Sequence, residues 1–190
     1  MIHQQLYLLQ YFSSVGIDLG KAIESWTGSK KTSQDYEFGS VSVEVKSSTA
    51  VDASRVNISN CRQLDDDSLD NLFLARVLFD VRQGDERTLP KLIDSIKVEL
   101  EKKAPESKLD FEEKLVRAGY QPKHVEQYNN RMYSKRNLTF YKVENDFPRI
   151  LESNLPVGIT KVTYEISLDV CRDFIIDEDN ALNAVRACCD

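Results

Sequence analysis

Residues 35–46, Asp-Tyr-Glu-Phe-Gly-Ser-Val-Ser-Val-Glu-Val-Lys, restrict the fold more than any other part of the chain. They predict two extended segments joined at Gly39-Ser40. In the second segment valines alternate with polar residues, so Glu44 and Lys46 must lie on the same face of a strand. When the chain turns back at Gly39, Asp35 is brought beside them. Two carboxylates and one ammonium group would then meet, which is the minimum set for holding a hard divalent cation and activating a water molecule.

The remaining patterns predict alternating helices and strands. Helices are expected at 4–12, 18–26, 88–103, 107–119 and 122–128, and after residue 177, with Asp18, Thr88 and Ser107 as N-caps. Strands are expected at 34–38, 41–47, 55–59, 71–81, 138–144 and 161–168. The segment 71–81 is apolar on both faces, which is typical of a central buried strand. This order predicts an α+β (or α/β) fold, with a mixed central β-sheet flanked by helices.

Composition excludes several classes of protein. The chain has 190 residues, 29% charged and 41% hydrophobic, as in an ordinary soluble domain. Neither a run of roughly 18 apolar residues nor a signal peptide is visible, so we expect no membrane contact and a cytoplasmic location. The four cysteines lack CxxC spacing and there are two histidines, which makes a zinc site or a disulfide scaffold improbable.

The charge is distributed unevenly along the chain. The net charge of −6 argues against a general nucleic-acid coat. Residues 121–142, however, contain five Lys and Arg residues against the single acid Glu126, and four aromatic residues. Such a segment would suit a one-sided phosphate-binding surface. A solvated charged face is the alternative interpretation.

The spacing Asp35…Glu44-x-Lys46 after a Gly turn resembles the PD-(D/E)XK nuclease superfamily. The chain is also similar to a branch of it associated with bacterial restriction and phage-defence gene clusters. Further segments carry this resemblance, from about residue 26 to 168: Trp26-Thr-Gly-Ser, Gln34-Asp-Tyr-Glu-Phe-Gly, Glu44-Val-Lys-Ser-Ser, Arg62-Gln-Leu, Asp146-Phe-Pro-Arg-Ile and Leu155-Pro-Val-Gly-Ile. Gln34 replaces the proline of the motif. The resemblance implies a restriction-endonuclease-like core made of a helix, a three-strand meander, a helix and a further strand.

The resemblance also implies a role for each candidate site residue. Asp35 and Glu44 would bind Mg²⁺, for which Mn²⁺ is expected to substitute, and Lys46 would position or help deprotonate the attacking water. Glu24, on the preceding helix, would complete a second metal site, although a surface helix Glu is the commoner explanation. Gln63 would orient the water or a phosphate, with a loop amide as the alternative. Trp26 is expected in the core.

The function implied is a metal-dependent DNA endonuclease that hydrolyses phosphodiester bonds in a restriction or anti-phage defence system. Its partners would be DNA, contacted at phosphates by Arg131, Lys135 and Arg136, and other defence-system subunits, with a homodimer left open. The alternative is a catalytically weak nuclease-fold module that binds DNA or a protein partner in a defence complex. A structural protein with a coincidental charged hairpin ranks last.

We expect one nuclease-like domain over residues 1–190. Residues 1–16 would form an N-terminal helical extension, 17–170 the core and 171–190 a C-terminal tail helix. Because proteins of the family that the chain resembles are usually longer, the chain is expected to be a short member or a fragment.

Overall fold

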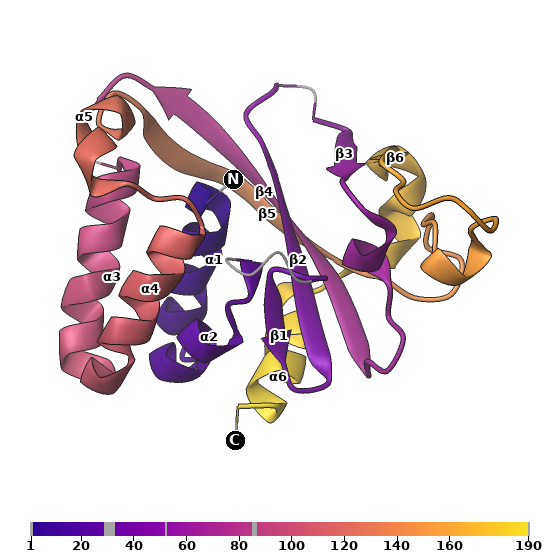
Figure 1. The fold of residues 1–190 in the computed structure, drawn as a ribbon, viewed down its shortest axis with the longest axis horizontal. Helices are drawn as coiled ribbons and strands as arrows, with labels where there is room; N and C mark the ends of the chain where they lie inside the picture. Colours follow the sequence, from indigo (N-terminus) through magenta and orange to yellow (C-terminus); the bar gives the residue numbers. More distant parts are fainter. Residues whose placement is uncertain (1, 29–32, 52, 85–86, 190) are drawn as a thin grey trace.

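A mixed five-stranded sheet organises the protein (Figure 1). The computed structural model describes residues 2–28, 33–51, 53–84 and 87–189. The strand order is β1-β2-β4-β5-β7, with β1 Tyr36–Phe38, β2 Val41–Ser48, β4 Asn71–Arg82, β5 Met132–Lys142 and β7 Ile175–Ile176. Among the described residues of this sheet, β2 and β4 are the only parallel pair, and the other neighbouring strands pair antiparallel. The twelve-residue β4 is central and largely buried, as its continuous apolar pattern predicts.

Helices cover one face of this sheet (Figure 1). The α-helices are α1 Ile2–Ser14, α2 Leu19–Ser25, α3 Leu89–Lys103, α4 Lys108–Arg117, α5 Val125–Tyr128 and α6 Glu178–Ala187, with short 3-10 helices η3 Pro105–Ser107 and η4 Pro122–His124 between α3 and α5. Their apolar side chains form one core cluster with the valines of β2. The mixed sheet with flanking helices confirms the predicted α+β fold class.

A small second sheet covers part of the other face. It pairs β3 Arg55–Ile58 with β6 Tyr164–Ser167, and the neighbouring 3-10 helices are η2 Cys61–Leu64, η5 Glu152–Asn154 and η6 Leu168–Phe174. The prediction that β3 would be the third strand of a meander is therefore wrong. In β3, exposed residues alternate with Val56 and Ile58, which are buried in a second core cluster. Only one face of β3 is therefore apolar, and that face packs against the main sheet. The position beside β2 goes to β4, whose two faces are both apolar.

Helix α1, which the sequence analysis places in an N-terminal extension, packs into the hydrophobic core. Leu6, Leu8, Leu9 and Phe12 are fully buried. The Tyr36 hydroxyl donates a 2.6 Å hydrogen bond to the backbone carbonyl of Gln5 and so ties β1 to this helix. An amphipathic surface helix would keep one polar face, whereas α1 is buried on several sides.

The helix boundaries agree with the sequence pattern, but the capping does not in two cases. Asp18 accepts a 2.8 Å hydrogen bond from Lys21 N, as an N-cap should. Thr88 and Ser107 make no side-chain cap bond. The second residue after Thr88 is Pro90, which has no N–H to donate. Ser107 has helical backbone angles because η3 runs directly into α4.

Replacing Leu9 by Ala tests whether α1 is part of the core. Deleting a fully buried leucine side chain removes apolar contacts and leaves a cavity, so we expect the free energy of unfolding to fall by about 2–5 kcal/mol. Ser14→Ala, at the exposed end of the same helix, should cost well under about 1 kcal/mol. Urea denaturation followed by circular dichroism measures both. Equal, small losses for the two variants would show that α1 is a dispensable extension.

Candidate active site

The β1–β2 hairpin places Asp35 at an open strand edge. Gly39, with φ +59°, makes the tight turn. Strand β1 pairs with β2 only as far as Val43, so the edge of β2 beyond Val43 is left without a neighbouring strand. The Asp35 carboxylate fills part of this gap, because its Oδ2 accepts a 3.0 Å hydrogen bond from Val45 N. Thr27 and Gly28 hold the Asp35 carbonyl with backbone N–H groups at 3.0 and 3.1 Å.

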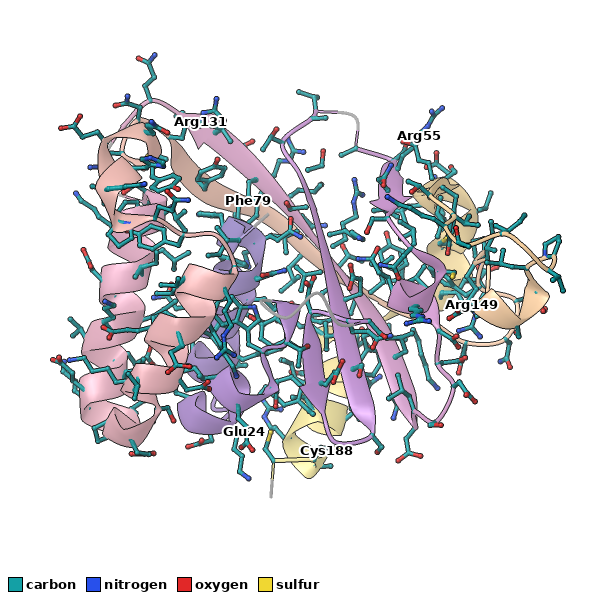
Figure 2. The ribbon with its side chains drawn as sticks, viewed as in Figure 1. Glu24, Arg55, Phe79, Arg131, Arg149 and Cys188 are labelled. Carbon is teal, nitrogen blue, oxygen red and sulfur yellow. The ribbon has the colours of Figure 1, made fainter. Side chains whose placement is uncertain are left out.

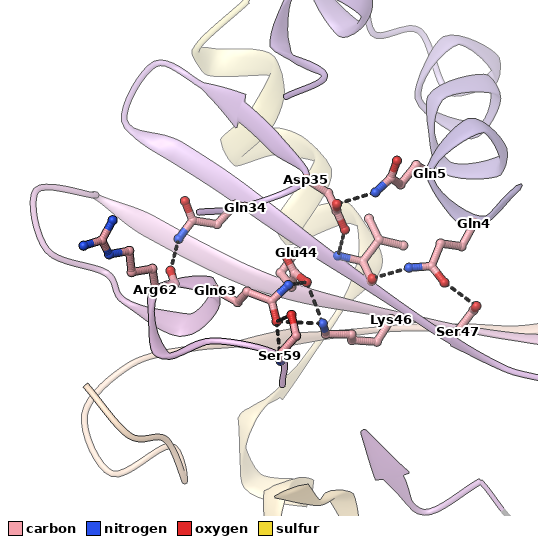
Figure 3. Close-up of polar contacts among 11 residues, drawn as sticks. Gln4, Gln5, Gln34, Asp35, Glu44, Lys46, Ser47, Ser59, Arg62 and Gln63 are labelled. Atoms are coloured by element: carbon pink, nitrogen blue, oxygen red, sulfur yellow. Dashed lines mark hydrogen bonds and ion pairs between the residues drawn. The ribbon is translucent and has the colours of Figure 1, made fainter. Parts of the chain in front are cut away.

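Two adjacent glutamines of α1 reach the same edge (Figure 3). Gln5 Nε2 donates to Asp35 Oδ1 at 2.5 Å, and Gln4 Nε2 donates to the Val45 carbonyl at 2.6 Å. The indole N–H of buried Trp26 donates to Gln5 Oε1 at 3.2 Å and thereby fixes which way the amide faces. Gly28 permits this close packing, because a Cβ there would lie 2.6 Å from Gln5 Nε2.

Glu44, Lys46 and Gln63 form a second group on the face of β2 that looks toward η2 (Figure 3). Lys46 Nζ lies 2.8 Å from Glu44 Oε1. The Gln63 amide bridges them, since its Nε2 donates to Glu44 Oε1 at 2.7 Å and its Oε1 accepts from Lys46 at 2.9 Å. Ser59 N also donates to Gln63 Oε1 at 2.9 Å. Glu44 is only 1% exposed, which excludes a solvent-facing strand residue.

The two carboxylates are close enough to influence each other. Burial, and then the charge of Asp35, raise the pKa of Glu44 to about 8, although Lys46 opposes this. Burial also raises the pKa of Asp35, against the hydrogen bond from Val45 N and the charge of Lys46. In addition, Glu44 Oε2 is buried and has no hydrogen-bond partner among the residues that the structure describes. Two buried acids beside one ammonium group thus favour a proton, or another cation, on Glu44.

This donor set fits a hard cation. Carboxylate and carbonyl oxygens are the ligands of Mg²⁺, which keeps several waters and therefore needs few protein groups. Asp35, Glu44 and the Val45 carbonyl supply such oxygens at the open edge of β2. Among the described residues no group of three or more His, Cys, Asp or Glu side chains converges on a metal site. The site would thus rest on two side chains and a backbone oxygen.

Distant segments hold Gln63 in place. Gln34 Nε2 donates to the Arg62 carbonyl of η2 at 2.8 Å. Arg62 makes two hydrogen bonds to Glu152 of η5, at 2.6 and 3.0 Å. Arg149 donates to the Leu64 carbonyl at 2.9 Å. The quoted segments around Gln34, Arg62 and Arg149 therefore share a structural task, which is to fix η2 against β2.

Glu24 does not join the cluster. Its side chain is exposed on α2 and points away from the sheet (Figure 2). Its backbone carbonyl accepts a 3.0 Å hydrogen bond from Lys114. The helix that does face Asp35 is α1, and it presents an amide there rather than an acid. The geometry thus gives no support to the prediction of a second metal site at Glu24.

The three predicted phosphate contacts are divided between the two faces of the sheet. Arg131 and Lys135 lie on the side of α1, where each borders a pocket that His3 also lines. Arg136 is the extra residue at a β-bulge and points to the other side, where it bonds Asp80 at 3.4 Å and the Ala50 carbonyl at 2.7 Å. The basic segment 121–142 therefore does not form the one-sided surface that the sequence predicted.

The sequence interpretation missed Gln4, Gln5 and Arg76. The signal for the glutamines was a polar pair inside an otherwise apolar helix. Arg76 is a cation in the middle of the apolar β4 segment, and it pairs in register with Lys46 on the neighbouring strand. It is 8% exposed, and in the described parts of the chain its Nε and Nη2 have no hydrogen-bond partner. Burial lowers its pKa, as expected for a cation without full compensation.

Comparisons with known proteins place this geometry in a family. None of the helices in the described parts of the chain is long and apolar enough to span a membrane. No match was found among curated proteins or among solved structures. Residues 5–169 match the family model described as "Putative PD-(D/E)XK family member, (DUF4420)". The match covers α1 from Gln5 onward, the Asp35…Glu44-x-Lys46 hairpin and the segments that hold η2, and the chain therefore belongs to this PD-(D/E)XK family.

Proposed function

We propose that this protein is a metal-dependent DNA endonuclease that hydrolyses phosphodiester bonds, acting in a bacterial restriction or anti-phage defence system. One observation carries the proposal: two buried carboxyl groups lie beside one ammonium group on β2, and burial together with the charge of Asp35 raises the pKa of Glu44 to about 8, so that a proton occupies an acid that a cation could bind. The family match supports nuclease-type chemistry. The defence context rests on the resemblance of the quoted sequence segments.

Each residue has a distinct task in this proposal. Asp35, Glu44 and the Val45 carbonyl would hold Mg²⁺ or Mn²⁺. When bound, the cation would supply Lewis-acid stabilisation of charge on the phosphate and a more acidic water. Lys46 Nζ, held by Gln63 beside Glu44, would orient the attacking water and offset charge that develops on the phosphate. Gln63 is thus a positioning residue for Lys46 and Glu44.

A second candidate function is a nuclease-fold module that binds DNA or a partner without cutting. The α1 glutamines favour it, because their amides donate to Asp35 Oδ1 and to the Val45 carbonyl, two oxygens that a cation would need. Cation binding would require these amides to turn away or to share their acceptors. Such a module would retain DNA affinity but would show no metal-dependent cleavage.

Substitution of the clustered side chains separates the two functions. For Asp35→Asn, Glu44→Gln and Lys46→Met we expect plasmid nicking with Mg²⁺ or Mn²⁺ to fall by about 10²–10³-fold, the size of losing one preorganised electrostatic group. DNA affinity, measured by gel shift in EDTA, should change little. Glu113→Gln, which neutralises an exposed acid on α4, should cut at the native rate. A native chain that folds and binds DNA but cuts with neither metal would establish the binding module instead.

The buried acids also predict how stability changes with pH. The raised pKa of Glu44 means that the folded protein keeps a proton that the unfolded chain releases above its ordinary pKa of 4.5. The free energy of unfolding in EDTA should therefore fall as pH rises from about 5 to about 8. Asp35 shifts in the same direction. Over this pH range we expect the free energy of unfolding of the native protein to fall by about 1 kcal/mol or more beyond the fall measured for Glu44→Gln.

The same experiment with Mg²⁺ tests the cation. Because a cation competes with the proton on Glu44, Mg²⁺ should raise the melting temperature of the native protein more at about pH 8 than at about pH 5.5. Glu44→Gln should not respond. Parallel pH profiles for both proteins, with no selective effect of Mg²⁺, would contradict a metal site built on Glu44.

A further inference from the structure

A basic pocket lies between α1, α3 and the start of β5. Its volume is about 460 Å³, and the described residues that line it include His3, Tyr7, Arg87, Lys91, Tyr133 and Lys135. Three of these side chains are cationic, although the chain as a whole carries a net charge of −6. Cations gathered in this way suit an anionic ligand.

Hydrogen bonds position Arg87, and a ring contact positions Lys135. Tyr133 N donates a 3.0 Å hydrogen bond to the Arg87 carbonyl, and Arg87 Nη1 donates to Ser134 Oγ at 3.2 Å. Lys135 Nζ lies 5.8 Å from the centre of the Tyr11 ring, in cation–π range. Lys91 projects from the first turns of α3. The three positive groups thus come from three separate segments and meet at one opening.

The rings of His3, Tyr7 and Tyr133 line the pocket. The Tyr7 and Tyr11 rings run parallel along α1, with centroids 6.4 Å apart. His3 packs on Tyr133 at 4.0 Å, and burial lowers the pKa of His3 to about 4, so this ring is neutral near pH 7. Tyr7 is only partly buried and lines the opening. Cations beside partly open aromatic rings are the combination that binds both the phosphates and the base faces of an unpaired strand.

The pocket adjoins the candidate active site. His3 and Tyr133 line it together with a second pocket that contains Gln4, Ser47 and Ser48. Gln4 is the residue whose amide binds the Val45 carbonyl, and Ser47 donates to Gln4 Oε1. A third pocket, which includes Arg131 and Tyr128, shares the same two rings. A strand that leaves the β2 edge would therefore pass Tyr133, which lines both pockets, on its way to the three cations.

We propose that this pocket binds an unpaired nucleotide of the nucleic-acid strand next to the cleavage site. In this role Arg87, Lys91 and Lys135 contact phosphate, and Tyr7 stacks on the base. The inference rests on the proposed nucleic-acid substrate, and it adds that the strand is read unpaired. Base faces are open to a tyrosine ring only in a single strand, because stacking covers them in a duplex.

Fluorescence anisotropy with a labelled ten-nucleotide thymidine strand in EDTA tests the proposal without cleavage. For the double variant Lys91→Gln/Lys135→Gln we expect Kd to rise about tenfold near 0.1 M salt, and the slope of log Kd against log salt to fall by about 1.4. The control Lys102→Gln/Lys161→Gln removes two exposed lysines outside the pocket, with the same change in net charge. It should bind like the native protein.

Tyr7→Leu tests the base contact. This change keeps an apolar side chain against Phe79, and thermal melting checks the fold. We expect Kd for the thymidine strand to rise about fivefold or more, and Kd for an abasic strand of the same length to stay unchanged.

Several outcomes would overturn the proposal. In the first, the two double lysine variants raise Kd for the strand equally. In the second, Tyr7→Leu raises Kd equally for the thymidine and abasic strands. In the third, the variants weaken binding of a duplex but not of the single strand. Because these experiments measure binding and not cleavage, they can reject the pocket proposal independently of the endonuclease proposal. A chain that binds the strand through this pocket but never cuts would reject only the endonuclease. A chain that cuts, with strand binding indifferent to these residues, would reject only the pocket.

Discussion

The burial of two carboxylates beside one lysine is the constraint on which the rest of the structure depends. An ionised acid removed from water destabilises a fold unless other groups compensate its charge. Here Asp35 receives hydrogen bonds from Val45 N and Gln5, while Glu44 receives them from Lys46 and Gln63. Among the described residues one Glu44 oxygen still lacks a partner. This unsatisfied oxygen is the observation from which the proposed cation and nuclease chemistry follow.

Two parts of the chain far apart in sequence serve this arrangement. Helix α1 is buried along most of its length, and its polar Gln4-Gln5 pair meets the open edge of β2. From the other side, η2 presents Gln63, and Gln34, Arg62 and Arg149 fix η2 in place. Because both supports come from packed elements, the acidic pair is preorganised rather than assembled by a mobile loop. The glutamine amides also donate to oxygens that a cation would use, so cation binding would have to break or weaken these hydrogen bonds from α1.

Local patterns predicted the elements well, and the hairpin best of all. Alternation in 41–47 placed Glu44 and Lys46 on one face, and the Gly39 turn brought Asp35 back to them. Pairing over long distances was harder to predict. Nothing local shows that β3 pairs with β6 in a separate sheet, since its alternating pattern suits either sheet. The β-bulge that turns Arg136 away from Lys135 depends on the register of β4 against β5. The position of Glu24 away from the cluster has a similar cause, because packing decides which helix faces the site.

Anomalous diffraction from crystals grown with Mn²⁺ would show whether the buried acids bind a cation. We expect a manganese peak beside the Asp35 and Glu44 carboxylates and the Val45 carbonyl, with the Gln4 and Gln5 amides shifted from their present acceptors, and no such peak in Glu44→Gln. A saturating concentration of Mn²⁺ that leaves this position without a peak, while both amides keep their hydrogen bonds, would contradict it. The cluster would then be a structural ion pair in a nuclease-like fold.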